Sequence, residues 1–209
     1  MAAENGALAS ARDFEALRWV SEQQAARVDQ VARAIGRSER TAQRWAKRMQ
    51  SQGLIEARRV LGDEPAWTWL TPKGQRVADT GFRPWKMSVG KLHHLAAVNE
   101  VRLYVAERSP ASEWTCERRL AQERENRTEH LPDAVVHTDG QRHAIEVELT
   151  QKASRRMAPI LDELARRFDV VLFFCSRPVR RQLEELAATG RWPKLAVRDV
   201  PRPTTAITP

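Results

Sequence analysis

The sequence predicts a two-domain protein of the α/β (α+β) class, in which a small helical domain with a strand hairpin precedes a mixed sheet flanked by helices. Three observations lead to this prediction. Short amphipathic helical patterns crowd the first 50 residues, strand-like apolar runs recur between residues 113 and 200, and a helix-poor stretch at 81–91 separates them. The predicted domains are therefore 13–80 and 92–200, with a linker at 81–91 and flexible ends at 1–12 and 201–209.

Length and composition exclude several classes of protein. The chain has 209 residues, of which 42% are hydrophobic and 30% are charged, so it is too apolar for a disordered tail and too polar for a membrane protein. No run approaches the roughly 18 apolar residues of a membrane span, and the N-terminus lacks the layout of a signal peptide. Cys116 and Cys175 stand far apart, which indicates neither a zinc cluster nor a disulfide framework. We expect a cytoplasmic globular protein with no membrane partner.

The first predicted domain begins with three helices. Apolar residues at three-residue steps predict a helix over 13–20, and the same spacing predicts a second one over 28–35. Gly36 permits the second helix to end, and Ser38 can cap a third helix at about 39–50. That third helix has an apolar face for packing and an opposite face rich in Arg, Lys and Gln, which can enter a groove.

Two short strands follow the third helix. The segment 54–60 has strand character, 61–65 has the residues of a turn, and 66–70 is rich in aromatic residues, which together predict a two-stranded wing. Thr71 and Pro72 then mark the start of another helix. The order of helices, Gly turn, basic helix and wing resembles the winged helix-turn-helix DNA-binding domains of bacterial regulators across 13–80. In such a domain Trp45, Trp67 and Trp69 are expected to be packing anchors.

The charge distribution predicts double-stranded DNA as the partner. Lys and Arg number 35 against 27 Asp and Glu, giving a formal net charge of +8. The alternative is an ordinary solvated helix face, but the basic residues follow the Gly36 turn and continue into the wing, which favours DNA. The predicted DNA-binding residues are Arg37, Arg40, Gln43, Arg44, Lys47, Arg58 and Arg59.

The second predicted domain alternates helices and strands. We expect a long helix over 92–105, strands over 113–117, 131–137 and 142–149, a helix over 151–168, a buried central strand over 170–175, a helix over 178–188 and a closing strand over 194–200. The order is α-β-β-β-α-β-α-β, and it predicts a mixed sheet flanked by helices.

Carboxylates gather on two of these strands. Side chains alternate along 142–149, so Glu146 and Glu148 share one face, and Asp133 on the preceding strand is expected at the same end of the sheet. Carboxylates so close together repel and raise one another's pKa unless a cation intervenes. Three oxygen ligands without a thiol or imidazole suit Mg²⁺ or Mn²⁺. We therefore predict Asp133, Glu146 and Glu148 as the ligands of one such cation.

Such a cation would polarise a phosphodiester and lower the pKa of an attacking water, so the acids predict a DNA endonuclease or nickase. Asp133, Glu146, Glu148 and Lys152 are the predicted catalytic residues, with Lys152 orienting the water or neutralising the phosphate. The alternative is a solvated sheet face with arginine partners, for which Arg142 and Arg155 are the nearest in sequence. Gln151 is a weaker candidate for the role of Lys152, and Glu117 could join the site from the first strand or the turn after it, whereas the five histidines are given no metal-binding role.

The same residues resemble two families. Pro132-Asp133, twelve intervening residues and then Glu146-Val147-Glu148 resemble the PD-(D/E)XK nuclease superfamily, whose core has an αβββαβ order; Glu148 stands where that superfamily usually has Lys. The segments 94–102, 114–120, 130–134 and 145–150 resemble the replication-relaxation proteins of actinobacterial plasmids and integrative elements, which join a winged helix to a PD-(D/E)XK-like domain.

The second resemblance implies a role in the DNA metabolism of a plasmid or mobile element, at the nucleoid or plasmid, and not a particular reaction. Three functions stay open. One is a Mg²⁺-dependent nuclease, and another is a non-catalytic replication or transcription regulator that uses the nuclease fold to bind DNA or to form a homodimer. The third is an adaptor that binds replication or transfer proteins.

Overall fold

The computed structural model describes residues 10–202, without the side chains of residues 154 and 155. Within that range the chain forms eight helices and two sheets, one of them mixed. The chain divides into two compact units between Leu92 and His93, called unit 1 and unit 2 below. The predicted flexible ends fall largely on residues 1–9 and 203–209, outside the described residues, but Ser10 caps the first helix and residues 11 and 12 begin it, so the prediction is wrong for these three.

Unit 1 has the element order of a winged helix. Its elements are α1 (Ala11–Glu22), β1 (Ala25–Arg27), α2 (Val28–Ala34), α3 (Glu39–Ser51), β2 (Ile55–Arg58), β3 (Trp67–Leu70) and α4 (Pro72–Ala78). Ser38 caps α3 by accepting a hydrogen bond from the Thr41 amide, and Thr71 caps α4 by accepting one from the Gly74 amide. Gly36 ends the preceding turn with a positive φ of 61°, a backbone conformation that favours glycine.

The sheet of unit 1 contains the predicted two-stranded wing, β2 and β3, and one further strand, β1, which was not predicted. Its order is β1-β3-β2, with both neighbours antiparallel to β3. β1 has only three residues, too few for its period of two to be read from the sequence. As the central strand, β3 is buried along its whole length, and Trp67 and Trp69 are packing residues, as predicted.

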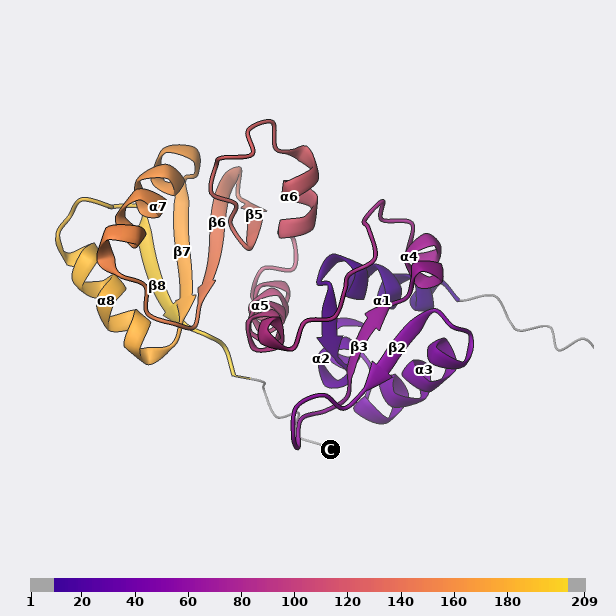
Figure 1. Cartoon of the computed structure of the whole chain (residues 1–209). Coiled ribbons are helices and arrows are strands. Elements are labelled where there is room, and N and C mark those ends of the chain that lie inside the picture. The colour runs from indigo at the N-terminus through magenta and orange to yellow at the C-terminus, as the bar shows by residue number, and fades with distance from the viewer. Residues whose placement is uncertain (1–9, 203–209) are drawn as a thin grey trace, which may run out of the picture. The chain divides into compact units, whose positions relative to one another are not determined.

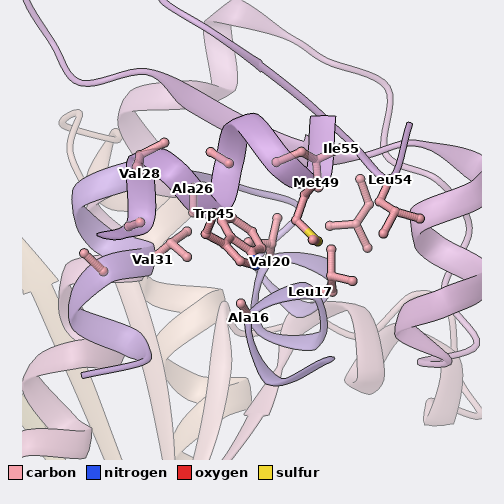
Figure 2. Close-up of a cluster of buried hydrophobic side chains, with 14 of the residues drawn as sticks. Ala16, Leu17, Val20, Ala26, Val28, Val31, Trp45, Met49, Leu54 and Ile55 are labelled. Atoms are coloured by element: carbon pink, nitrogen blue, oxygen red, sulfur yellow. The ribbon is translucent and has the colours of Figure 1, made fainter. Parts of the chain in front are cut away.

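The core of unit 1 joins α1, α2, α3 and the sheet. Figure 2 shows Leu17 and Val20 of α1, Trp45 and Met49 of α3, and Ile55 of β2 gathered in this cluster. All five side chains are buried, so the apolar face of α3 is committed to the interior. Burial of such side chains is the main stabilising contribution to a small domain.

One glycine of unit 1 is required by a close approach. A Cβ placed on Gly74 of α4 would lie 1.8 Å from the carbonyl oxygen of Leu54. That oxygen accepts hydrogen bonds from the Thr71 amide at 3.0 Å and from the Thr71 hydroxyl at 3.2 Å, so it is held in place. Only glycine fits at this contact between α4 and the start of the wing.

Unit 2 is built around a five-stranded sheet of order β4-β5-β6-β7-β8. Its elements are α5 (Val89–Arg108, which starts in unit 1), β4 (Glu113–Cys116), α6 (Glu117–Glu123), β5 (Ala134–Thr138), β6 (Gln141–Glu148), α7 (Ser154–Arg167), β7 (Val170–Cys175), α8 (Arg177–Ala188) and β8 (Leu195–Asp199). β4, β5 and β6 are antiparallel, whereas β6, β7 and β8 are parallel. From α5 to β7 the chain has the predicted αβββαβ order, with helix α6 added between the first two strands.

Helix α6 and the position of Asp133 correct the sequence prediction. The sequence predicts a strand that ends at residue 117, but Glu117 begins α6, a helix of seven residues with no buried side chain and therefore no apolar stripe to detect. The sequence also predicts Asp133 within a strand, but this residue lies immediately before β5, whose first residue Ala134 pairs with Ile145.

Helices cover both faces of this sheet. In Figure 1, α7 and α8 lie on one face of β6, β7 and β8, where they pack against Val171 and Phe173. On the other face, Val98 and Val101 of α5 pack against Val147 and other residues. Side chains alternate along β6, so Glu146 lies on the face of α7 and α8.

Both cysteines of the chain are buried, and neither forms a disulfide. Burial raises the pKa of the Cys175 thiol to about 11, and the carboxylate of Asp199 contributes to the rise. Among the described helices, none is both long enough and apolar enough to cross a membrane.

Candidate functional site

The polar face of α3 presents four of the predicted DNA-binding residues to solvent. Arg40, Gln43, Arg44 and Lys47 are all exposed, while Trp45 on the opposite face is buried in the core. Within residues 10–202, Arg40, Arg44 and Lys47 take part in no ion pair, so their charges remain available to a polyanion. This face can therefore bind phosphates and base edges without any change in the core.

A groove of about 340 Å³ lies between α3 and the wing. Gln43 and Lys47 line it from α3, and Arg59 lines it from the residue that follows β2. Asp29 and Glu39 also line it, so one groove holds both acceptors and donors. Hydrogen bonding of both kinds is what recognition of base edges requires.

The remaining two predicted residues differ in their surroundings. Arg37 is exposed immediately after Gly36, at the approach to α3. Arg58 lies 3.8 Å from Glu56, and its guanidinium stacks over the ring of Trp69 at 5.0 Å. Arg58 is thus partly engaged within unit 1, whereas Arg37 projects from the turn.

The three predicted catalytic carboxylates lie at one end of the sheet in unit 2. Glu148 ends β6, Glu146 lies two residues earlier on the same face, and Asp133 precedes the antiparallel neighbour β5. Burial is the main cause that raises the pKa of Glu146, and the charge of Asp133 adds to the rise. The three acids gather at one end of the sheet, as the sequence predicts, but His94 and His130 as partners of Asp133 and Glu146 are not predicted.

Asp133 is held by two bonds. His94 Nε2–H of α5 donates to Asp133 Oδ1 at 2.9 Å, and the Val147 amide donates to Oδ2 at 2.7 Å. The second bond continues the β5–β6 ladder, with a side-chain carboxylate in place of the next backbone acceptor. The bond to Asp133 raises the pKa of His94 above its ordinary value, so the pair favours an imidazolium and a carboxylate.

Asp133, Glu146 and Glu148, with their partners, are called the acidic cluster here, and Glu146 forms its most buried pair. Its Oε1 lies 2.7 Å from His130 Nε2. Burial raises the pKa of Glu146 to about 7, against the lowering effect of the His130 bond, and that same bond raises the pKa of His130. The backbone of His130 is fixed as well, because its amide donates to Glu163 Oε1 at 2.7 Å and its carbonyl accepts from Arg167 at 2.8 Å.

Glu148 pairs with Lys152, the remaining predicted catalytic residue. The Lys152 ammonium forms an ion pair with Glu148 Oε2, and the Thr150 amide donates to Oε1 at 3.4 Å. The Lys152 carbonyl accepts from the Gln182 side-chain amide of α8 at 2.7 Å, which anchors the loop after β6. Lys152 thus lies beside an acid of the cluster and is engaged with it.

The cluster is layered, with acids inside and bases outside. The side chains of Asp133, Glu146 and Glu148 are 16%, 9% and 9% exposed, whereas their partners His94, His130 and Lys152 are 40%, 26% and 40% exposed. Each carboxylate therefore directs an oxygen to its own cationic or N–H partner, and the partners face solvent.

This arrangement does not fit the predicted Mg²⁺ or Mn²⁺. Such an ion needs carboxylate oxygens that converge on one point and keep room for waters. Both oxygens of Asp133 already accept hydrogen bonds, and among residues 10–202 no group of three or more His, Cys, Asp or Glu is placed to hold a metal ion. No catalytic step through a metal follows from this geometry.

The expected arginine partners of the acids are replaced by other groups. Arg142 stacks over the ring of Phe168 at 5.0 Å, and the side chain of Arg155 lies outside the described part of the chain. Glu117 approaches through its backbone, since its amide donates to the Asp133 carbonyl at 3.0 Å. The sequence signals for His94 and His130 are weak: His130 precedes Asp133 by three residues, and His94 lies on a helix expected to cover the sheet.

Comparisons with known proteins show the family of the chain and a similar solved structure. The chain matches the family model described as replication-relaxation over residues 17–163, which is more than half of its length. A comparison with curated proteins finds no match. Among solved structures, a mutant of ZitR from Lactococcus lactis is similar at 19% identity and a TM-score of 0.30, over 53% of this chain and 78% of that chain.

Proposed function

The chain belongs to the replication-relaxation family, and we propose that it serves the replication of a plasmid or other mobile element by binding double-stranded DNA through unit 1. The observation that carries this proposal is the division of α3 into a buried apolar face and an exposed face with Arg40, Gln43, Arg44 and Lys47. A helix with these two faces, next to a two-stranded wing, suits insertion into a major groove.

The residues of this face would have distinct tasks. Arg40, Arg44 and Lys47 supply charges that bind phosphates or the acceptor atoms of guanine. Gln43 lies among them and lines the groove beside the wing, where its amide can donate to and accept from an adenine. Arg59 lines the same groove from the wing side. Affinity would come mainly from the charges and sequence preference from Gln43.

We propose unit 2 as a non-catalytic partner of this binding unit. Support comes from the carboxylates, which are paired one by one with His94, His130 and Lys152. Paired in this way, the acids hold bases at the surface and do not present open ligand oxygens. The metal-dependent nuclease stays a second candidate, favoured by the gathering of Asp133, Glu146 and Glu148 at one end of the sheet.

Two measurements test the role of unit 1. Selection from a random duplex pool in EDTA should enrich a sequence with the full chain, and Q43A should relax the preference at one position by roughly 1–3 kcal/mol. A chain that enriches no sequence and binds no duplex would contradict the role of unit 1. Sedimentation of the selected complex reports whether one or two chains bind.

The nuclease candidate is tested separately. Supercoiled, linear and branched DNA are incubated with the chain in Mg²⁺, Mn²⁺ or EDTA, and we expect no cleavage. We also expect no metal-dependent rise in melting temperature, because a cation that binds only the folded state would stabilise it. Cleavage that is lost in E146Q would establish the nuclease instead.

A further inference from the structure

A second basic groove lies in unit 2, at the carboxyl ends of β7 and β8. It has a volume of about 510 Å³, and its lining includes Tyr104 of α5, Arg177 of α8, Arg198 of β8 and Arg202 beyond it. The three arginines come from different segments of the chain and are all exposed. Three guanidinium groups therefore border one open groove.

The acid in this groove is already neutralised. Asp199 Oδ2 accepts a hydrogen bond from Arg180 at 2.8 Å, and Arg180 also bonds Glu184. Within residues 10–202, Arg177 and Arg202 form no ion pair, and the side chain of Arg198 bonds only to the neighbouring Val197 carbonyl. The groove thus has an excess of positive charge that no described side chain balances, and its complement is an anion.

The position of the groove is one where α/β sheets bind ligands. Because β6, β7 and β8 are parallel, their carboxyl ends meet at one edge, with Glu148, Cys175 and Asp199 in register. Ligands of open α/β sheets bind outside this edge. The first turn of α8 adds to the field, since it contains no acid and the Ser176 hydroxyl donates to Leu149 and does not cap the helix.

Tyr104 indicates which form of nucleic acid fits. Arg108 stacks over one face of its ring at 4.7 Å, and the ring packs against Phe174 at 5.9 Å with an interplanar angle of 72°. The ring is therefore engaged within unit 2 and is a poor platform for a base. Proteins that bind single strands depend on such platforms, whereas a duplex backbone needs only cations.

We propose that this groove binds the sugar-phosphate backbone of double-stranded DNA and forms a second, sequence-independent DNA contact of the chain. The proposal rests on the proposed function, because it assumes that DNA is the polyanion that the chain meets. Arg177, Arg198 and Arg202 each contact a phosphate, and the open shape of the groove lets the backbone run through it.

The test uses the full chain and a labelled duplex of arbitrary sequence, titrated between about 50 and 200 mM salt. In R177A/R198A/R202A the affinity should fall about tenfold or more, and the slope of log K against log salt should become shallower by about 0.9 for each phosphate that the variant no longer neutralises. R177K/R198K/R202K should keep most of the slope. The control R166A/R181A/R191A removes the same charge from exposed sites elsewhere in unit 2.

Each outcome decides for or against the groove. If the alanine variant and the control lose affinity equally, only net charge matters and the groove is not a binding site. A single strand that depends more strongly than the duplex on these arginines overturns the assignment to duplex DNA. Loss of binding to polyglutamate without loss of DNA binding would assign the groove to an acidic protein instead.

The variant R40A/R44A, measured in parallel, separates this proposal from the proposed function. If only R40A/R44A weakens the binding of duplex DNA, the result supports the role of unit 1 and contradicts DNA binding by the groove. If only R177A/R198A/R202A weakens it, the result supports DNA binding by the groove and contradicts the role of α3.

Discussion

Arg48 of α3 forms a two-bond ion pair with Asp13 of α1: Nη2 lies 2.6 Å from Oδ1 and Nη1 lies 3.1 Å from Oδ2. Asp13 is almost fully buried and also accepts a hydrogen bond from the Ser10 amide at 2.7 Å. The helix that carries the predicted DNA-binding face is therefore joined to the first helix by a pair with fixed geometry. Burial opposes ionisation of Asp13, but the bonds from Arg48 and Ser10 outweigh it and hold its pKa below the ordinary value.

The first prediction concerns this pair. R48A leaves the buried carboxylate without its arginine, so the free energy of unfolding should fall by about 2 kcal/mol in urea titrations at pH 7. R44A, an exposed neighbour on the same helix, should change it by less than about 0.5 kcal/mol. Because the folded pKa of Asp13 is depressed, its contribution is present above about pH 4 and is lost as the pH falls through the folded value. D13N should therefore lose less stability than the wild type under acid.

The second prediction concerns the exposed face of α3. R40A/R44A should bind duplex DNA about tenfold or more weakly, with a salt slope shallower by about 0.9 for each phosphate left without its arginine. The melting temperature should not change, since neither side chain enters the core. R76A/K86A, which removes two exposed charges of unit 1 outside α3 and the wing, is the matched control. Equal affinities for the two double variants would exclude α3 from the interface.

The third prediction concerns Glu146. Its pKa is raised on folding from 4.5 to about 7, so the folded chain holds this proton more tightly and ionisation of Glu146 destabilises the fold. The raised pKa of His130 acts in the same direction, because its contribution is also lost as the pH rises. The stability of E146Q relative to wild type should therefore increase between about pH 4.5 and pH 7, as measured by denaturant titration. A pH-independent difference would contradict this account of the pair.

The fourth prediction uses two glycines. G74A should lower the free energy of unfolding by about 2 kcal/mol or more, because the methyl group collides with the Leu54 carbonyl. G90A adds the same methyl group to helix α5, where no heavy atom lies within 4 Å, and it should be neutral or stabilising by up to about 1 kcal/mol. If the two variants melt alike, the close approach of α4 to the wing is not rigid.

Most helices and strands could be predicted because their apolar periods are long enough to read. α3 shows why, since Ala42, Trp45 and Met49 repeat at helical spacing between a capping Ser38 and a Gly53 with positive φ. β1 could not be predicted, because three residues carry no period and its place is fixed by pairing with β3. Helix α6 was not predicted, because it buries no side chain and therefore has no apolar period to read.

The candidate site of unit 2 could be predicted only in part, because some of its contacts join segments that are far apart in the sequence. Alternation along β6 places Glu146 and Glu148 on one face, and the turn at Asp139 and Gly140 sets the register that brings Asp133 close. His94 and His130, the partners of Asp133 and Glu146, come from α5 and from the loop before β5, and no local pattern links such distant segments. Pairing of the acids with His94 and His130, rather than with a metal or Arg142, depends on tertiary packing.

The burial of both native cysteines makes the chain a convenient host for site-specific labels. The Cys175 thiol, with a pKa of about 11, is scarcely ionised at neutral pH, and thiolate is the form that reacts with maleimides. A cysteine introduced at an exposed position, such as Asp63 in the turn of the wing or Pro178 next to the second groove, should therefore react far faster than either native thiol. Fluorophores attached there would report separately on DNA contact at each groove, with no need to replace Cys116 or Cys175.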